Sequence, residues 1–299
     1  MKRLFEFFTA NIRNVNTRQA YAAACSRFFD WADQKGIRHL GAVEPSIVAA
    51  YIEGLQRELA APSVKQHLAA IRMLFDWLVV GQVMPHNVAA SVRGPKHVVR
   101  QGKTPILSTE QTRLLLDSLP LLKKDGSPDL AGLRDRALIG IMVFAFARVS
   151  AVTRMRVCDY FPNGKRYWLR LHEKGGKEHQ LPTHHRLEGF LDEYIAAMGI
   201  GNLTEQPLFR KLRPDKAPTS VPMSRNDVLR MVKRRVAAAG LPSVTCCHSF
   251  RATGITSYLE LGTLEHAQAI ACHESPRTTK LYDRTGDQIT LEEIERIRI

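Results

Sequence analysis

The 299-residue chain carries 43 Lys and Arg residues against 29 Asp and Glu residues, which gives a formal net charge of +14 and a pI near 9.8. This excess favours a polyanionic partner, with a merely basic soluble protein as the alternative. The composition, 44% hydrophobic and 24% charged, excludes a disordered chain. The sequence contains neither an apolar run of membrane-spanning length nor a secretory signal, so we expect two cytosolic domains without membrane association.

Residues 1–93 show the apolar periodicity of helices. One predicted helix, "TRQAYAAACSRFFDWADQKG", ends at Gly36, a residue that readily takes the left-handed conformation of a helix stop. A second is predicted to start around Pro45, and a third to start near Ser63, whose capping-box spacing to Gln66 would satisfy free backbone N–H groups at a helix start. The pattern predicts a bundle of about four helices.

Basic residues follow this bundle in a segment, 94–104, that Gly94 and Pro95 keep out of regular structure. A positively charged linker can lie along DNA phosphates, since phosphate contacts need charge but no base-reading geometry; a solvated charged linker explains the same residues. Lysines and arginines on the third helix and in the linker are candidate DNA contacts, with a solvated helix face as the alternative for the first two: Lys65, Arg72, Lys96, Arg100 and Lys103.

A second domain, residues 105–299, begins with another capping-box spacing, Ser108 and Gln111. A strongly apolar helix is predicted from about Leu133, and Arg148 is set into this run just past "FAF". A buried charge is costly without an anionic partner, so this arginine either has a structural ion pair or waits for an anion.

The stretch "RYWLRLHEKGGKEHQLPTH" is the one clear β segment. Apolar and polar residues alternate through Tyr167 to His172, and Gly175 with Gly176 allow a tight reversal into a second strand. Lys174 then lies at the hairpin tip, where a lysine either projects into a cleft or is solvated.

The five cysteines are odd in number and irregularly spaced, which indicates no disulfide framework. The pairs Cys247-His248 and Cys272-His273 lack the spacing that brings two thiolates to one zinc ion, so we expect buried thiols and no metal site.

The carboxyl-terminal stretch "CCHSFRATGITSYLELGTLEHAQAIACHESPRTTKLYDR" gathers polar groups within an apolar helical pattern. They are His248, Arg251, His273 and Tyr282. Buried polar groups need satisfied structural roles or a reaction. Ser275 and Pro276 predict a helix start, which puts Tyr282 about two turns on, ahead of a loop.

These residues, in this order, resemble the catalytic domain of the tyrosine recombinase (phage integrase) family. The resemblance rests on Arg148, a hairpin lysine, the HxxR of "HSFR", and "CHESPRTTKLY", which is close to the family's "GHSSxxTTxxY". It covers nearly the whole chain. It implies a mainly α fold with a small antiparallel β-sheet: a helical core-binding (SAM-like) DNA-binding domain, then an α+β catalytic domain.

The resemblance also implies a site-specific DNA recombinase that cleaves and rejoins strands through a 3′-phosphotyrosyl intermediate and a Holliday junction. Arg148 and Arg251 would hold the phosphate, because each guanidinium presents a charged planar fork of donors. Tyr282 would be the nucleophile, His248 would assist its proton transfer, His273 would hydrogen-bond the phosphate, and Lys174 would protonate the leaving 5′-oxygen. Neither ATP nor a metal cofactor is implied, because the covalent link keeps the free energy of the phosphodiester.

Tyr258 is a rival nucleophile, since it lies seven residues after Arg251 and would share its helix face. Its surroundings, "ITSYLEL", are typical of a helix interior, where a tyrosine is usually a core residue, and the family pattern favours Tyr282.

The sequence departs from the family pattern at Ala151, where the family usually has an acidic residue that steadies the active-site network. Another group must then support that network, or activity is reduced. The terminal residues 290–299, "TLEEIERIRI", predict a short amphipathic helix. In the family such a helix docks on the neighbouring subunit, which implies a tetramer on double-stranded DNA with a specific site; packing on its own domain is the alternative.

Two other functions share parts of this pattern. A type IB topoisomerase-like enzyme uses similar chemistry as a monomer, which the amino-terminal bundle and terminal helix argue against. A catalytically inactive DNA-binding relative would lack a catalytic residue, whereas all six are present. The target DNA sequence and the choice among integration, excision, resolution and inversion lie outside what the residues specify. The resemblance places the protein in a prokaryotic cytosol.

Overall fold

A computed structural model describes residue 7 and residues 12–99, 102–173, 176–284 and 294–295. The chain divides into two compact units, Met1–Val98 and Val99–Ile299, and the division falls within the segment expected to link two domains. Each unit is described by itself.

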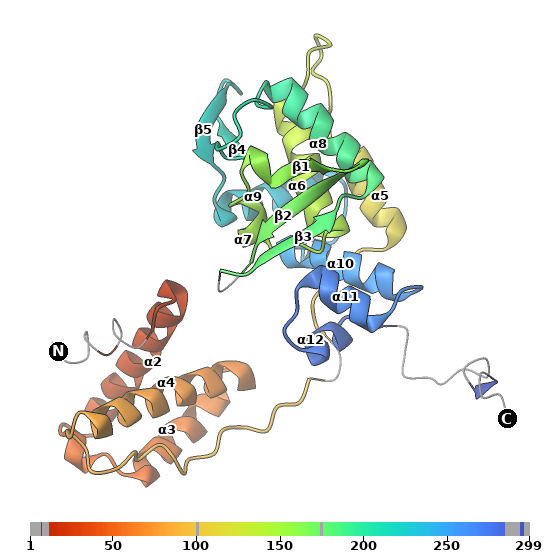
Figure 1. Cartoon of the computed structure of the whole chain (residues 1–299). Helices are drawn as coiled ribbons and strands as arrows, with labels where there is room; N and C mark the ends of the chain where they lie inside the picture. Colours follow the sequence, from red (N-terminus) through yellow and green to blue (C-terminus); the bar gives the residue numbers. More distant parts are fainter. Residues whose placement is uncertain (1–6, 8–11, 100–101, 174–175, 285–293, 296–299) are drawn as a thin grey trace. The chain divides into compact units, whose positions relative to one another are not determined.

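The smaller unit is helical in its described part (Figure 1). Its elements are α2 (Val15–Gln34), the 3₁₀ turn η1 (Leu40–Ala42), α3 (Pro45–Glu58) and α4 (Ala61–Val80). The sequence correctly predicted that the first of these helices stops at Gly36, which has a φ of +79°, and that Pro45 begins the next. Apolar faces of the three helices pack into one core around Phe28, Tyr51 and Phe75.

The predicted start of α4 was wrong. The helix begins two residues before Ser63, after Ala60, with Pro62 in its first turn and no side-chain cap. Because proline pre-sets the helical φ and lacks an N–H that would need a partner, it starts the helix without a capping box.

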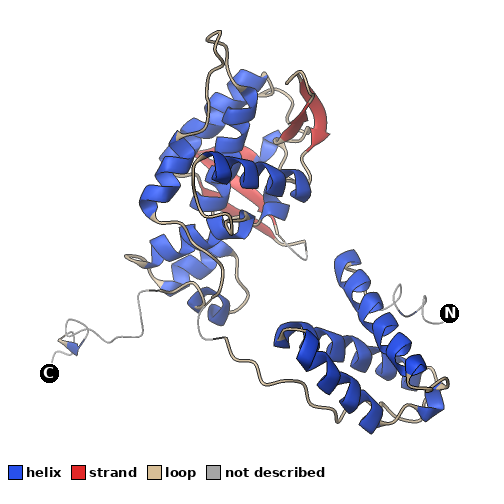
Figure 2. Ribbon diagram, turned by 180° about the vertical axis from the view of Figure 1, so that it is seen from behind, coloured by secondary structure: helices blue, strands red, loops and turns tan. Residues whose placement is uncertain are grey.

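The described part of the larger unit contains two sheets among its helices (Figure 2). Its first helices are α5 (Thr109–Asp117), α6 (Leu130–Phe144), the short α7 (Val149–Val152) and the turn η2 (Val157–Asp159). Helices α8 (His185–Met198), α9 (Arg225–Ala238), α10 (Cys247–Leu259), α11 (Leu264–Ala271) and α12 (Pro276–Lys280) follow. The predicted capping boxes and caps of α5 and α12 are confirmed at Ser108 and Ser275.

The predicted hairpin is present as the antiparallel pair β2 (Arg166–His172) and β3 (Glu178–Pro182), with Leu169 opposite Leu181. A strand that the sequence analysis missed, β1 (Tyr160–Asn163), pairs on the other side of β2. The sequence analysis also missed β4 (Arg210–Leu212) and β5 (Pro218–Pro222), which form an antiparallel pair. The fold is therefore mainly α with small antiparallel sheets, as predicted.

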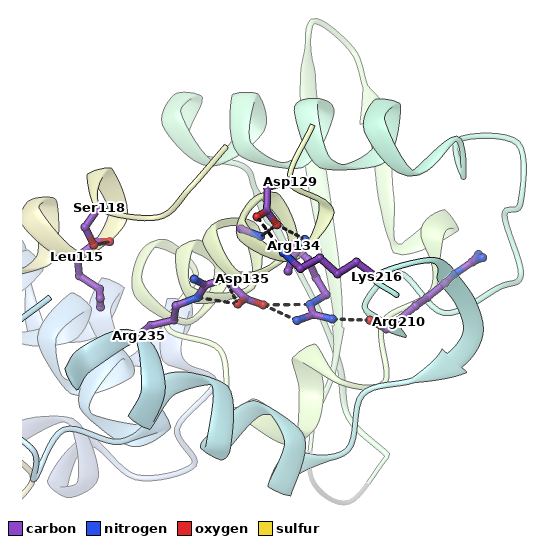
Figure 3. A network of polar contacts seen from close by, with 10 residues as sticks. Leu115, Ser118, Asp129, Arg134, Asp135, Arg210, Lys216 and Arg235 are labelled. Atoms are coloured by element: carbon purple, nitrogen blue, oxygen red, sulfur yellow. Dashed lines mark hydrogen bonds and ion pairs between the residues drawn. The ribbon is translucent and has the colours of Figure 1, made fainter. Parts of the chain in front are cut away.

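Helix α6 lies in the middle of the larger unit, where it packs against α8 and α10 (Figure 1). It is buried from Gly132 to Val143, including its charged residues. Asp135, fully buried, accepts from Arg134 (Nη2 at 2.7 Å) and from Arg235 of α9 (Nε at 2.9 Å), as Figure 3 shows. Because two guanidinium groups satisfy one buried carboxylate, this network ties α6 to α9 without leaving the charge unpaired.

Candidate active site

Arg148 lies at a break between two helices, which corrects the prediction that a continuous helix contains it. Helix α6 ends at Phe144, Phe146 takes a left-handed conformation with φ +49°, and Arg148 is the residue before α7. The break turns the arginine side chain, about one-third exposed, toward the carboxylate of Glu173, with which it forms an ion pair. The charge therefore has an anionic partner, as its burial cost requires.

Arg251 comes from α10 and is 1% exposed. Its guanidinium donates to the carbonyl of Phe146 and, at 2.6 Å, to that of Ala271, so it joins the α6 break to the end of α11. Its Nε is buried and has no hydrogen-bond partner within the described part of the chain. Burial and the nearby Arg148 charge lower the pKa of Arg251 to about 10, so it stays charged at neutral pH.

His273 comes two residues after α11, and the residue between them, Cys272, takes a left-handed conformation. Its Nδ1 lies 2.9 Å from the hydroxyl of buried Thr279 in α12. Burial, followed by the charges of Arg251 and Arg148, lowers the pKa of His273 to about 3. The imidazole is therefore neutral at physiological pH.

Tyr282 comes two residues after the end of α12, and its side chain is turned inward, only 7% exposed. The phenol oxygen is 2.9 Å from Nε2 of His248, and the ring stacks on the imidazole of His273 at 5.7 Å between centroids. The hydroxyl of Thr256 in α10 donates to the backbone carbonyl of Tyr282 at 2.9 Å, which fixes the chain beside α10.

His248 lies in the first turn of α10, three residues before Arg251, so the two side chains share a helix face. Burial, then the charges of Arg251 and Arg148, lowers the pKa of His248. A neutral imidazole can accept a proton from the Tyr282 hydroxyl through its Nε2 lone pair.

Tyr258, the rival nucleophile, lies three turns after His248 in α10 and packs edge-to-face on Phe146 at 6.0 Å. Tyr258 is partly buried against the apolar cluster that contains Phe146 and Tyr282. No contact joins it to the two histidines among the residues that the structure describes.

The hairpin residue Lys174 lies outside the described residues. The chain that follows it contacts α11 and the residue after His273: Nε2 of His179 in β3 lies 3.1 Å from the carbonyl of Ile270 in α11, and Lys177 pairs with Glu274 at 2.9 Å. The hairpin therefore packs beside the segment that carries His273.

The sequence analysis missed three groups of this site: the Glu173 carboxylate, the Thr279 hydroxyl and the Phe146 carbonyl. Thr279 lies within the motif "PRTTKLY" and Glu173 directly precedes Lys174, so the positions of both residues offered a sequence signal. The role of the Phe146 carbonyl depends on a backbone reversal that side-chain patterns do not record.

The candidate DNA contacts differ in their surroundings. Lys65, Lys96 and Lys103 are exposed, whereas Arg100 lies outside the described residues. Arg72 donates to the backbone carbonyls of Ala89 and Val92, which gives it a structural role in holding the chain after α4.

No cluster of three or more His, Cys, Asp or Glu residues suited to a metal ion occurs in the described ranges. No described helix is both long and apolar enough to cross a membrane.

Comparison with known families matches both units. The model of the phage integrase family matches residues 107–288, and that of the phage integrase N-terminal SAM-like domain matches residues 7–81. Among curated proteins, the chain is 26% identical over 289 residues to tyrosine recombinase XerD of Corynebacterium glutamicum, covering 92% of this chain and 90% of that one. It is 28% identical to tyrosine recombinase XerC of Pelobacter propionicus, covering 89% of this chain and 80% of the relative.

Solved structures share the fold. A XerH site-specific recombinase bound to palindromic difH substrate, in a post-cleavage complex, gives a TM-score of 0.71 at 18% identity and covers 89% of this chain and 75% of that chain. A lambda integrase tetramer bound to a Holliday junction gives 0.68 at 18% identity, with 97% and 78% coverage.

Proposed function

This chain belongs to the phage integrase family, and on that premise we propose that it is a tyrosine-type site-specific recombinase. In this proposal it exchanges DNA strands through a 3′-phosphotyrosyl intermediate and a Holliday junction. The observation that carries the proposal is the 2.9 Å contact between the Tyr282 hydroxyl and Nε2 of His248, beside buried arginine charge. A phenol paired with a neutral base in a cationic pocket suits attack on a phosphodiester.

In the proposed reaction, the Tyr282 oxygen attacks phosphorus while the bond to the 5′-oxygen breaks. His248 accepts the phenol proton, since its lowered pKa keeps the imidazole unprotonated. The phosphorus keeps two ester bonds throughout, so the reverse attack by a 5′-hydroxyl rejoins the strand without ATP.

Arg148 and Arg251 are the proposed clamp for the non-bridging phosphate oxygens. Negative charge on those oxygens develops during the attack, so fixed guanidinium charges lower the barrier without reorganising. The unpartnered buried Nε of Arg251 supports this assignment, because a buried donor without an acceptor is costly and a phosphate oxygen would satisfy it.

His273 is proposed to donate a hydrogen bond to the phosphate. If the Thr279 hydroxyl donates to Nδ1, the neutral ring carries its proton on Nε2 and presents that proton outward. Lys174 completes the proposal as the acid that protonates the leaving 5′-oxygen, a role that follows from the family resemblance.

The proposed division of the chain assigns DNA clamping to residues 1–93 and phosphate tracking to the linker 94–104, with chemistry in residues 105–299. The exposed residues Lys65, Lys96 and Lys103 support backbone contacts in the first two segments. We place the protein in a prokaryotic cytosol, acting as a tetramer on double-stranded DNA, with residues 290–299 contacting the neighbouring subunit. Loss of synapsis on deleting residues 290–299, with the monomer still folded, tests that last assignment; unchanged recombination contradicts it.

The test uses a nicked duplex from which the cleaved strand end diffuses away, so that a covalent adduct accumulates. The target sequence is first sought in the DNA flanking the gene. Wild-type protein should form the adduct in EDTA, and Tyr282→Phe should form none, with Tyr258→Phe as the matched control. An adduct that persists in Tyr282→Phe overturns the assignment, and failure to resolve a synthetic four-way junction favours a topoisomerase-like enzyme instead.

A further inference from the structure

The active site holds a buried carboxylate that the family pattern does not supply at its usual place. Position 151, where the family usually has an acidic residue, is an alanine that is 0% exposed in the core of the larger unit. The acid next to the phosphate-binding residues is instead Glu173, whose side chain is 4% exposed and whose Oε2 accepts from Nη1 of Arg148.

The peptide group that joins His172 to Glu173 is held at both of its polar atoms. Its own N–H donates to the carbonyl of Lys177 at 2.7 Å across the base of the hairpin, and the carbonyl of His172 accepts from Arg154 at 2.6 Å. The imidazole of His172 lies 3.2 Å from buried Asp159. A carboxylate on a backbone held this way has few alternative positions, so it can impose one orientation on the guanidinium that it binds.

The charges of the site explain why a carboxylate is needed beside Arg148. Burial and then the charge of Arg148 lower the pKa of Arg251, as expected for two neighbouring cations, whereas the Glu173 carboxylate raises it. A guanidinium has five N–H donors, and the contact with Glu173 uses one of them. The carboxylate therefore compensates the repulsion between the arginines and still leaves Arg148 donors for a phosphate oxygen.

We infer that Glu173 is a positioning residue that holds Arg148 in its phosphate-binding orientation, in place of an acid at position 151. The inference rests on the proposed function, because it concerns the orientation of a group proposed to bind the scissile phosphate. Glu173 acts through Arg148 and does not itself touch the DNA.

The test measures covalent adduct formation in single turnover, over a range of DNA concentrations, with the nicked duplex. The variants are Glu173→Gln, which keeps the shape and removes the charge, Arg148→Lys, and the double variant. Glu193→Gln is the matched control, because Glu193 also pairs with an arginine, in this case Arg136 of α6, elsewhere in the larger unit. Thermal melting of each variant shows that it is folded at the assay temperature.

Glu173→Gln should lower the rate at saturating DNA about 10- to 100-fold, since a small misplacement of a catalytic group has effects of that size, while half-saturation changes less than about threefold. In the Arg148→Lys background the same change should have less than about a twofold effect, because residues that act through each other are not additive. Glu193→Gln should match wild type.

Three results overturn the inference. The first is a Glu173→Gln rate equal to or above that of wild type, and the second is a double variant in which Glu173→Gln lowers the rate as much as it does alone. The third is an equal loss of rate in Glu193→Gln. A rate above wild type would show that Glu173 competes with phosphate for Arg148. If wild-type protein forms no adduct at all, the proposed function fails and this inference with it, whereas a normal wild-type adduct with an unaffected Glu173→Gln rejects the inference alone.

Discussion

The Tyr282 hydroxyl and Nε2 of His248 lie 2.9 Å apart, although 34 residues separate them in the sequence. Three neighbouring segments make this contact: α10 supplies the histidine, and α11 with α12 carries the chain back to α10, where Thr256 holds the Tyr282 carbonyl. The nucleophile and its proton acceptor are thus already within hydrogen-bonding distance in the protein alone.

His248→Gln should lower the rate of adduct formation about 100- to 1,000-fold, because glutamine can hydrogen-bond the phenol but cannot accept its proton at neutral pH. The variant should melt close to wild type. Quenched-flow sampling of adduct on the nicked duplex measures the rate. A loss smaller than about threefold would show that another group takes the proton.

The pH dependence of wild-type cleavage follows from the lowered pKa of His248. Since the folded pKa lies below the ordinary value of 6.5, the imidazole stays unprotonated through neutral pH and the rate should fall only below pH 6.5. Initial rates at DNA concentrations far below saturation report ionisations of the free enzyme. An acidic midpoint at or above 6.5 contradicts this role.

Thr279→Val should reduce both stability and rate. It removes the hydroxyl that lies 2.9 Å from Nδ1 of His273 while it keeps the shape of a fully buried side chain. The free energy of unfolding should fall by about 1–2 kcal/mol, the usual effect of a lost buried hydrogen bond. Cleavage should slow about tenfold because His273 loses its orientation. Thr278→Val, at an exposed neighbouring position, is the control and should change neither quantity appreciably.

Gly254→Ala should destabilise the larger unit by about 1–3 kcal/mol or more, because an added methyl group cannot fit between two helices. A Cβ at this position would lie 2.0 Å from the carbonyl oxygen of Val143 and 2.8 Å from the ring of Phe146. Gly189→Ala, in α8 with no atom within 4 Å of its Cβ, should instead stabilise the protein by about 0.5–1 kcal/mol. Urea unfolding compares the two, and equal effects would contradict the close approach of α6 and α10.

Substitutions at two basic residues of α4 should have different effects, one on DNA affinity and the other on the stability of the fold. Lys65→Gln should reduce the slope of log affinity against log salt by about 0.9, the effect of one lost phosphate contact, without changing stability. Arg72→Gln should destabilise the helical unit by about 1–3 kcal/mol, because the carbonyls of Ala89 and Val92 lose their donor. Salt titrations of binding and urea unfolding check the pair; an unchanged slope for Lys65→Gln would remove it from the interface.

Local signals in the sequence predicted the element boundaries where a cap or glycine sets them. Gly36, Ser108 and Ser275 each mark the expected helix end or start, because their effect needs only neighbouring backbone. The helix through Arg148 was mispredicted because "FAFARVSAV" stays apolar across the break, so periodicity gives no sign of the left-handed Phe146. Packing of Phe146 with α10 residues such as Ala252 accompanies that break, and such contacts are distant in sequence.

For the candidate site, the sequence indicated the polar residues themselves but not the groups that support them. The order of Arg148, His248, Arg251, His273 and Tyr282 was visible as a motif, and the structure brings these residues together. The support for them was not visible, since the partner of Arg148 lies 25 residues away, in a hairpin whose packing against α7 is a tertiary contact. The strands β4 and β5 were missed because β4 has only three residues and β5 begins and ends with proline, features that weaken strand signals.

The most direct test of the account is the identity of the residue that carries DNA after cleavage. The trapped complex formed on a nicked duplex would be digested with protease and nuclease, and the remaining nucleotide located by peptide mass spectrometry. We expect a single modified peptide with the 3′-phosphate esterified to the phenol of Tyr282. A nucleotide on Tyr258, or on any other side chain, would contradict the account.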